Sequence, residues 1–171
     1  GNFDNSYLYK DVNVIKCKKC GHIFNLLNKY DVINLKKYYE KEYAPINITS
    51  KNDNVDRPGE INPKNVKRYH NIYNLISKLI KKESRILDIG CAMGGFLDYI
   101  ASQGFINLYG IDMCEEYIQI AQLKPYINFK IGCAEKIPFE SNFFDVVILD
   151  QVLEHLHNPR KVLKEIRRVL A

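Results

Sequence analysis

The chain has 171 residues, of which 46% are hydrophobic and 26% charged, enough for one globular domain with an appendage. Its net charge of +5 is modest, and lysines alternate with acidic residues, which argues against a nucleic-acid-binding stripe. No apolar run approaches the roughly 20 residues that cross a bilayer, and the first residues lack a signal-peptide pattern. We therefore expect a cytoplasmic protein without a membrane contact.

The first 45 residues form a segment rich in Tyr, Asn and Lys. It contains a knuckle, Cys17-Lys-Lys-Cys20, and a Tyr-rich stretch at 38–43 that we expect to be helical. A structural zinc needs four ligands, and a second cysteine pair is missing, so we expect no bound metal. Residues 46–62 are polar and rich in turn formers, which predicts a linker or a mobile loop.

From residue 63 to 171 the sequence alternates between helical and extended patterns. Helices are predicted at 63–82, 94–102, 115–123 and 158–170, and strands at 85–89, 107–112, 128–132 and 145–150. This order predicts an α/β fold with a doubly wound, mostly parallel, Rossmann-like sheet flanked by helices. Because the pattern stops after the fourth strand and its helix, we expect a domain that is incomplete at its C-terminus and has an open edge at 145–150.

The first of these strands runs directly into a turn of small residues, Gly90, Ala92, Gly94 and Gly95. Small residues let the backbone approach a ligand, because a Cβ would fill that space. The amides that open the following helix would bind an anionic group of that ligand. By itself, such a turn fits a dinucleotide or S-adenosylmethionine, and a tight turn without a ligand is the structural alternative.

Two acidic residues distinguish between these cofactors. Asp88 lies just before the turn, where its charge would repel a pyrophosphate and attract the ammonium group of S-adenosylmethionine. Two such charges about 4 Å apart attract each other by roughly 4 kcal/mol at an effective dielectric constant near 20, before desolvation. Asp112 ends the next strand, where a carboxylate either binds both ribose hydroxyls or stabilises the following helix N-terminus. An NAD-dependent oxidoreductase is therefore the less favoured hypothesis.

Several segments together resemble class I S-adenosylmethionine-dependent methyltransferases. Leu87-Asp-Ile-Gly-Cys-Ala-Met-Gly94 resembles their first motif, and Tyr109-Gly-Ile-Asp112 resembles their second-strand acid. Cys133-Ala-Glu-Lys-Ile-Pro-Phe139 resembles their adenine-side loop, and Gln151-Val-Leu-Glu-His-Leu156 the segment after the fourth strand. The motifs cover about residues 64–171 in the expected order. The knuckle near the N-terminus resembles a remnant of the zinc ribbon found upstream in some small-molecule methyltransferases.

The resemblance implies cofactor contacts at the ends of the strands. The expected residues are Asp88, Gly90, Cys91, Ala92, Gly94, Asp112, Met113, Ala134, Glu135, Asp150 and Gln151. Within this set, Asp112 would bind the ribose hydroxyls, Met113 would pack on the adenine, and Ala134 and Glu135 would lie at the adenine edge. The chain departs from the family at Ala92, which replaces a usual glycine, and at Cys133, which replaces a frequent aspartate.

His155 is the candidate catalytic residue, because a general base helps when the methyl acceptor is a hydroxyl or an ammonium group. The alternative is a structural, hydrogen-bonding histidine beneath the cofactor. Tyr38, Tyr39 and Tyr43 either cover the cofactor pocket or form a helix face packed on the domain. These two alternatives stay open at the level of the sequence.

The expected function is methyl transfer from S-adenosyl-L-methionine to a small molecule, such as a sugar or a cell-envelope precursor, with S-adenosyl-L-homocysteine as product. The second hypothesis is a catalytically incomplete cofactor-binding or partner module, since the part that usually shapes the acceptor site is missing. A second copy of the chain, or another partner chain, is a candidate to cover the open sheet edge. Nucleic acid is not an expected partner.

Overall fold

The computed structural model describes residues 3–9, 12–21, 23–25, 28–43 and 57–171. The chain divides into two compact units, Gly1–Tyr38 and Tyr39–Ala171. Most of the linker expected at 46–62 lies outside the described residues, which resume at Arg57. The domain boundaries expected from the sequence therefore stay predictions.

The first unit contains a small antiparallel sheet, which the sequence pattern does not predict. Strands β1 (Phe3–Tyr9), β2 (Val12–Cys17) and β3 (Ile23–Asn25) pair in that order. Helix α1 (Lys29–Lys37) follows, with a capping box between Asn28 and Asp31. The knuckle forms the turn after β2, where the Gly21 amide donates to the Cys17 carbonyl at 2.8 Å. Over the described residues, no three His, Cys, Asp or Glu side chains are grouped to hold a metal ion.

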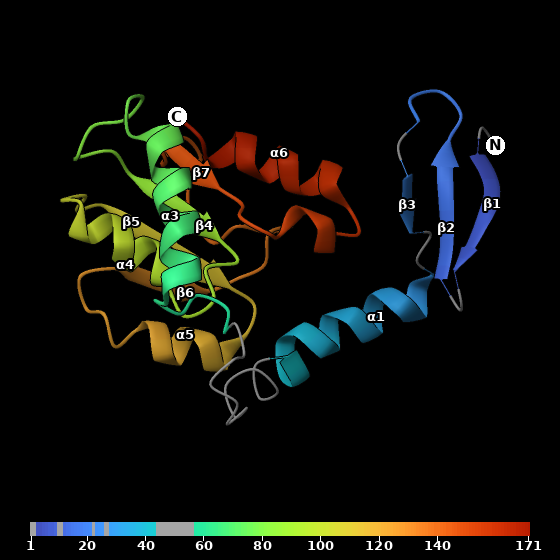
Figure 1. Cartoon of the computed structure of the whole chain (residues 1–171), viewed down its shortest axis with the longest axis horizontal. Coiled ribbons are helices and arrows are strands. Elements are labelled where there is room, and N and C mark those ends of the chain that lie inside the picture. The colour runs from blue at the N-terminus through green and yellow to red at the C-terminus, as the bar shows by residue number, and fades with distance from the viewer. Residues whose placement is uncertain (1–2, 10–11, 22, 26–27, 44–56) are drawn as a thin grey trace. The chain divides into compact units, whose positions relative to one another are not determined.

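The second unit contains the predicted parallel sheet. Its strands are β4 (Ile86–Ile89), β5 (Leu108–Asp112), β6 (Asn128–Ile131) and β7 (Val146–Ile148), and the spatial order is β6-β5-β4-β7 (Figure 1). All three pairings are parallel, which confirms the doubly wound α/β fold. At the β7 edge, Leu170 forms a parallel bridge with Phe144, and the Ala171 amide donates to the Phe144 carbonyl at 2.9 Å. The last residues of the chain therefore pair beside the start of the edge that we expected to be open.

Helices begin where the sequence predicts a cap. Asn62 and Asn158 cap α3 (Pro63–Ile76) and α6 (Pro159–Val169), each with proline at the first helical position. Helix α4 (Gly95–Ser102) and helix α5 (Glu115–Ala121) follow β4 and β5. The predicted end of the first of these helices, at residue 82, is wrong, because α3 stops at Ile76. Leu79 is 83% exposed, so no packing supports another helical turn there.

The sheet has a hydrophobic layer on each face. One layer joins Ile86, Leu108 and Phe129 to residues of α3, α4 and α5, and the other joins Leu87 and Ile111 to α6. Because successive strand residues point to opposite faces, Asp88 lies on the same face as Ile86, toward α3 and α4. Across the described ranges, no helix combines the length and apolar character needed to span a membrane.

Candidate cofactor site at the carboxyl edge of the sheet

The turn after β4 is tight and tied to the neighbouring strand. Gly90 and Gly94 have φ angles of +75° and +76°, in the left-handed region that favours glycine. The amides of Gly90 and Cys91 both donate to the Ile111 carbonyl, at 2.8 and 3.1 Å. The Gly94 amide donates back to the Cys91 carbonyl at 2.8 Å, and α4 begins at the next residue. The turn is therefore fixed before any ligand binds.

The space beside each glycine of the turn is filled by the protein itself. A Cβ on Gly90 would lie 2.4 Å from Cγ2 of Val152, and one on Gly94 would lie 2.4 Å from Cζ of Phe129. A Cβ on Gly95 would lie 2.3 Å from the carbonyl oxygen of Gly59. A Cβ here would therefore collide with the protein rather than occupy ligand space, as the sequence had led us to expect, because these glycines make room for neighbouring residues.

Ala92 and Cys91 complete the turn in different ways. Ala92 has a φ of +45°, so the residue that replaces a usual glycine adopts a conformation in which alanine is strained. Cys91 is 3% exposed and belongs to the core beneath the turn. Burial, with a smaller contribution from Asp88, raises the pKa of its thiol well above the usual value. The cofactor contact predicted for Cys91 therefore concerns its backbone.

Asp112 holds the turn with its carboxylate. Its Oδ2 accepts the Ala92 amide at 3.0 Å, and its Oδ1 accepts the Cys114 amide at 2.9 Å. Cys114 is the N-cap residue of α5, so Asp112 stabilises that helix start and the glycine turn at once. Each oxygen makes one of these bonds, and a carboxylate oxygen has two lone pairs, so acceptor capacity remains for ribose hydroxyls.

Asp88 is a buried acid behind the turn, with 5% of its surface exposed. Desolvation is the largest cause that raises its pKa well above the usual range, followed by repulsion from Asp150 and Asp112. The guanidinium of Arg68 lowers the same pKa. A cationic group that enters the site would favour the ionised form of Asp88, so this buried acid fits an ammonium or a sulfonium.

Arg68, on α3, is a site residue that the sequence analysis missed. Its Nε lies 3.1 Å from Asp150 Oδ2, and its Nη1 donates to Gln151 Oε1 at 2.7 Å. Gln151, in the segment after β7, has a φ of +56°, in the left-handed region. Its side chain is held by the hydrogen bond from Arg68. The predicted positions Asp150 and Gln151 thus lie at the end of β7, beside the β4 turn.

His155 lies on the short 3-10 helix Leu153–His155 and is exposed. Its Nδ1 is 2.9 Å from the hydroxyl of Tyr39, and the two rings are 5.4 Å apart at their centroids. Tyr39 belongs to the π-helical segment Tyr38–Glu42, and Tyr43 just after it packs on a cluster of Ala92, Cys114 and Tyr117. Tyr43 therefore contacts the β4 turn, and Tyr39 contacts the candidate catalytic histidine.

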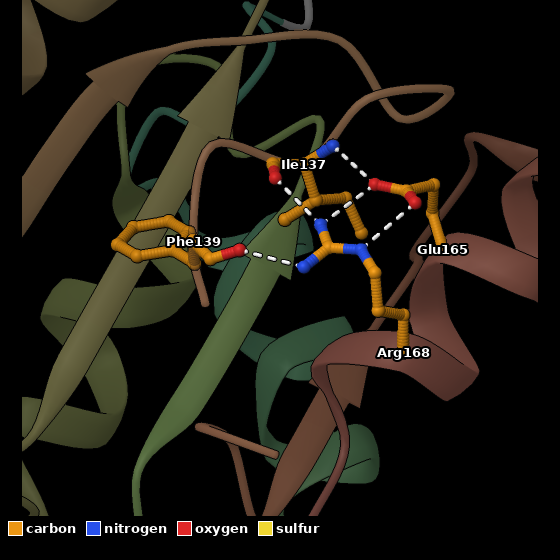
Figure 2. A network of polar contacts seen from close by, with 4 residues as sticks. All are labelled: Ile137, Phe139, Glu165 and Arg168. Atoms are coloured by element: carbon orange, nitrogen blue, oxygen red, sulfur yellow. Dashed lines mark hydrogen bonds and ion pairs between the residues drawn. The ribbon is translucent and has the colours of Figure 1, made fainter. Parts of the chain in front are cut away.

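The loop at 133–139, after β6, is held by α6 (Figure 2). Arg168 donates to the carbonyls of Phe139 and Ile137, each at 2.9 Å, and also binds Glu165 at 2.8 Å. The Glu165 carboxylate in turn accepts the Ile137 amide at 3.0 Å. Because of this network, the loop is held firmly beside the sheet.

That loop carries the predicted adenine-side residues. Ala134 is 7% exposed, and Glu135 lies 3.6 Å from Nδ1 of His157 in an ion-pair geometry. Met113, which we expect on the adenine, is half-buried directly after β5. All the residues predicted to bind the cofactor therefore follow or end strands at the same edge of the sheet.

Comparisons with known proteins identify the domain that carries this site. Residues 87–171 match a family model described as methyltransferase domain. These residues form a methyltransferase domain. The motifs and the parallel sheet place it in class I, whose methyl donor is S-adenosylmethionine and whose product is S-adenosylhomocysteine.

Curated relatives and solved structures agree with this assignment. The chain is 33% identical over 111 residues to norajmaline N-methyltransferase of Rauvolfia serpentina. The aligned region covers 61% of this chain and 37% of that enzyme. PH0226 protein from Pyrococcus horikoshii has a TM-score of 0.54 at 26% identity, covering 85% of this chain and 62% of that one. A putative methyltransferase from an antibiotic biosynthesis pathway of Anabaena variabilis has a TM-score of 0.56 at 26% identity, over 62% of this chain and 42% of its own. The chain thus spans little more than a third of the first curated relative.

Proposed function

We propose that this protein transfers a methyl group from S-adenosylmethionine to a small-molecule acceptor. The observation that carries the proposal is the pair of acids around the left-handed glycine turn. Asp88 is a buried acid beside the turn, and the Asp112 carboxylate accepts two amides around the turn with acceptor capacity left. This arrangement suits a cationic nucleoside and disfavours the pyrophosphate of NAD.

In the proposed complex, residues of this chain mainly bind and orient. Asp112 would accept hydrogen bonds from the ribose hydroxyls, while Met113, Ala134 and Glu135 would line the adenine. Asp88 and the β4 turn would bind the amino-acid end. The cofactor supplies a sulfonium methyl group that is already activated, so in-line positioning and exclusion of water provide much of the rate enhancement.

We propose His155 as the residue that receives the proton when the acceptor is a hydroxyl or an ammonium group. Its Nδ1 is engaged by Tyr39, so Nε2 is the ring nitrogen left for the acceptor. The acceptor itself is proposed as a sugar, a cell-envelope precursor or, by similarity to the N-methyltransferases of Rauvolfia serpentina, an amine.

Calorimetric titration with S-adenosylhomocysteine and with NAD tests the cofactor assignment. We expect submillimolar binding of S-adenosylhomocysteine only, and binding of NAD instead would contradict the proposal. Asp112→Ala should weaken S-adenosylhomocysteine binding by about 1–3 kcal/mol, because ribose hydroxyls lose their acceptor. Asp98→Ala is the matched control, since that carboxylate instead accepts the Tyr126 hydroxyl at 2.6 Å.

The second candidate function is a cofactor-binding module without its own catalysis. A homodimer or a partner chain at the β7 edge would then complete the acceptor site. A methyl-transfer assay against sugars, cell-envelope precursors and amines, with and without candidate partners, separates this function from the first.

A further inference from the structure

Arg68 places a positive charge at one end of the proposed cofactor site. It reaches from α3 to the end of β7, where its Nε and Nη1 contact Asp150 and Gln151 at 3.1 and 2.7 Å. Its Cζ also lies 5.5 Å from the centroid of the Tyr69 ring. The two polar contacts and the ring hold the guanidinium in one place.

The groups around Arg68 are mostly acidic. Asp88 interacts electrostatically with Asp150, Asp112 and Arg68, and Asp150 interacts with both Arg68 and Glu154. Tyr69 is affected by the same Arg68, Asp88 and Asp150. Among the described residues, Arg68 is therefore a cation that acts on both Asp88 and Asp150, where burial raises the pKa of each carboxyl and Arg68 lowers it.

Arg68 lies beside a strand that pairs with β4. In the order β6-β5-β4-β7, the proposed ribose and adenine contacts lie at β5 and after β6. The β4 turn would hold the amino-acid end of the cofactor, and β4 pairs directly with β7. That is the strand whose end carries the Arg68–Asp150 pair.

We propose that Arg68 sets the preference of this site between the cationic methyl donor and its neutral product. This inference rests on the proposed function. S-adenosylmethionine has a permanent sulfonium charge, whereas S-adenosylhomocysteine has a neutral thioether at the same atom. A positive charge at Arg68 disfavours the sulfonium relative to the thioether, and the negative charge of Asp150 does the opposite.

This balance also matters for the rate of methyl transfer. The acceptor lone pair forms a bond to the methyl carbon as the carbon–sulfur bond breaks, the sulfur keeps the bonding pair and becomes neutral, and the acceptor proton passes to the proposed base His155. A site with too much negative charge near the sulfur would stabilise the charged ground state more than the transition state, which raises the barrier. Arg68 limits that excess, so it is a specificity-determining residue rather than a group that reacts.

Calorimetric titrations of the full chain with both ligands test the inference. The measured quantity is the ratio of the two dissociation constants, S-adenosylhomocysteine over S-adenosylmethionine. We expect Arg68→Gln to raise this ratio about fivefold, equivalent to about 1 kcal/mol of charge interaction. Asp150→Asn should lower it by a similar factor, and the double variant should return it close to the wild-type ratio.

The charge-conserving variant separates this role from a structural one. Arg68→Lys should keep the wild-type ratio even where both affinities fall, because it loses the fork that contacts Asp150 and Gln151 together but keeps the charge. Equal weakening of both ligands in Arg68→Gln would overturn the inference and leave the proposed function intact. Wild-type protein that binds neither ligand would overturn the proposed function and this inference together. If Arg68→Gln does not fold, a ratio in Asp150→Asn equal to that of wild type overturns the inference.

Discussion

Gly90→Ala is the substitution whose effect the structure predicts in most detail. Gly90 has a φ of +75°, and alanine in the left-handed region costs about 1–2 kcal/mol. In addition, its Cβ would lie 2.4 Å from Cγ2 of Val152. Valine is restricted at χ1, and the backbone before it is held through Gln151 by Arg68, so relief requires backbone movement. Overpacking of this kind costs about 1–3 kcal/mol, which brings the expected loss of stability to about 2–5 kcal/mol.

Gly104→Ala is the matched control for backbone strain. Gly104 has a φ of +89°, but the nearest atom to its Cβ would be Cδ of Lys82 at 3.9 Å, an ordinary contact. This variant should therefore lose only the strain energy, about 1–2 kcal/mol. Urea denaturation followed by far-ultraviolet circular dichroism measures both free energies of unfolding.

A double-mutant cycle isolates the contact between Gly90 and Val152. Val152→Ala removes the methyl group that the new Cβ would meet, so the double variant should be more stable than the sum of the single changes predicts, by about 1–3 kcal/mol. If Gly90→Ala costs no more than Gly104→Ala, and shows no coupling to Val152→Ala, then the turn does not depend on this close approach. That result would refute the claim that Val152 fills the space beside Gly90.

Three further predictions concern charges and hydrogen bonds. The folded-state pKa of Asp88 is raised, so wild-type stability falls as pH rises above the unfolded-state pKa of this residue. Asp88→Asn should therefore have a higher urea midpoint than wild type at pH 7. This gain should vanish near pH 4, about the unfolded pKa of aspartate. The same variant should bind S-adenosylhomocysteine more weakly, and an unchanged midpoint at pH 7 would contradict the burial argument. Arg168→Lys should lower the free energy of unfolding by about 1–2 kcal/mol, because the guanidinium contacts to two carbonyls and Glu165 are lost. The hydrogen bond from Arg168 lowers the folded-state pKa of Glu165, so wild-type stability should fall as pH drops through that pKa. The variant should lose part of this acid dependence. Tyr39→Phe should change the ring 15N shifts of His155 but not those of His157, and identical spectra would show that the hydroxyl contact is absent in solution.

The local pattern of the sequence predicts the type and order of the main elements of the second unit, but not the end of α3. Strands at 85–89 and 107–112 were predicted within a residue or two of β4 and β5, because a short apolar run followed by a turn is a local signal. Asn-Pro pairs gave the starts of α3 and α6, since a cap and a proline act on the adjacent turn. The β1–β3 sheet was missed, because Asp4, Asn5 and Ser6 interrupt the alternation that marks a strand.

The acids and the glycine turn were also identifiable from the sequence, because each lies at the end of an apolar run where parallel strands share an edge. What fills the space beside the glycines was not, since it depends on Phe129 from β6 and on Val152, the N-cap residue of the 3-10 helix after β7. Arg68 lies 83 positions from Gln151, and Tyr39 lies 116 positions from His155. A periodic pattern reports only which side of its own element a residue occupies, whereas these contacts exist because packing α3 and the Tyr-rich stretch against the sheet brings distant side chains together.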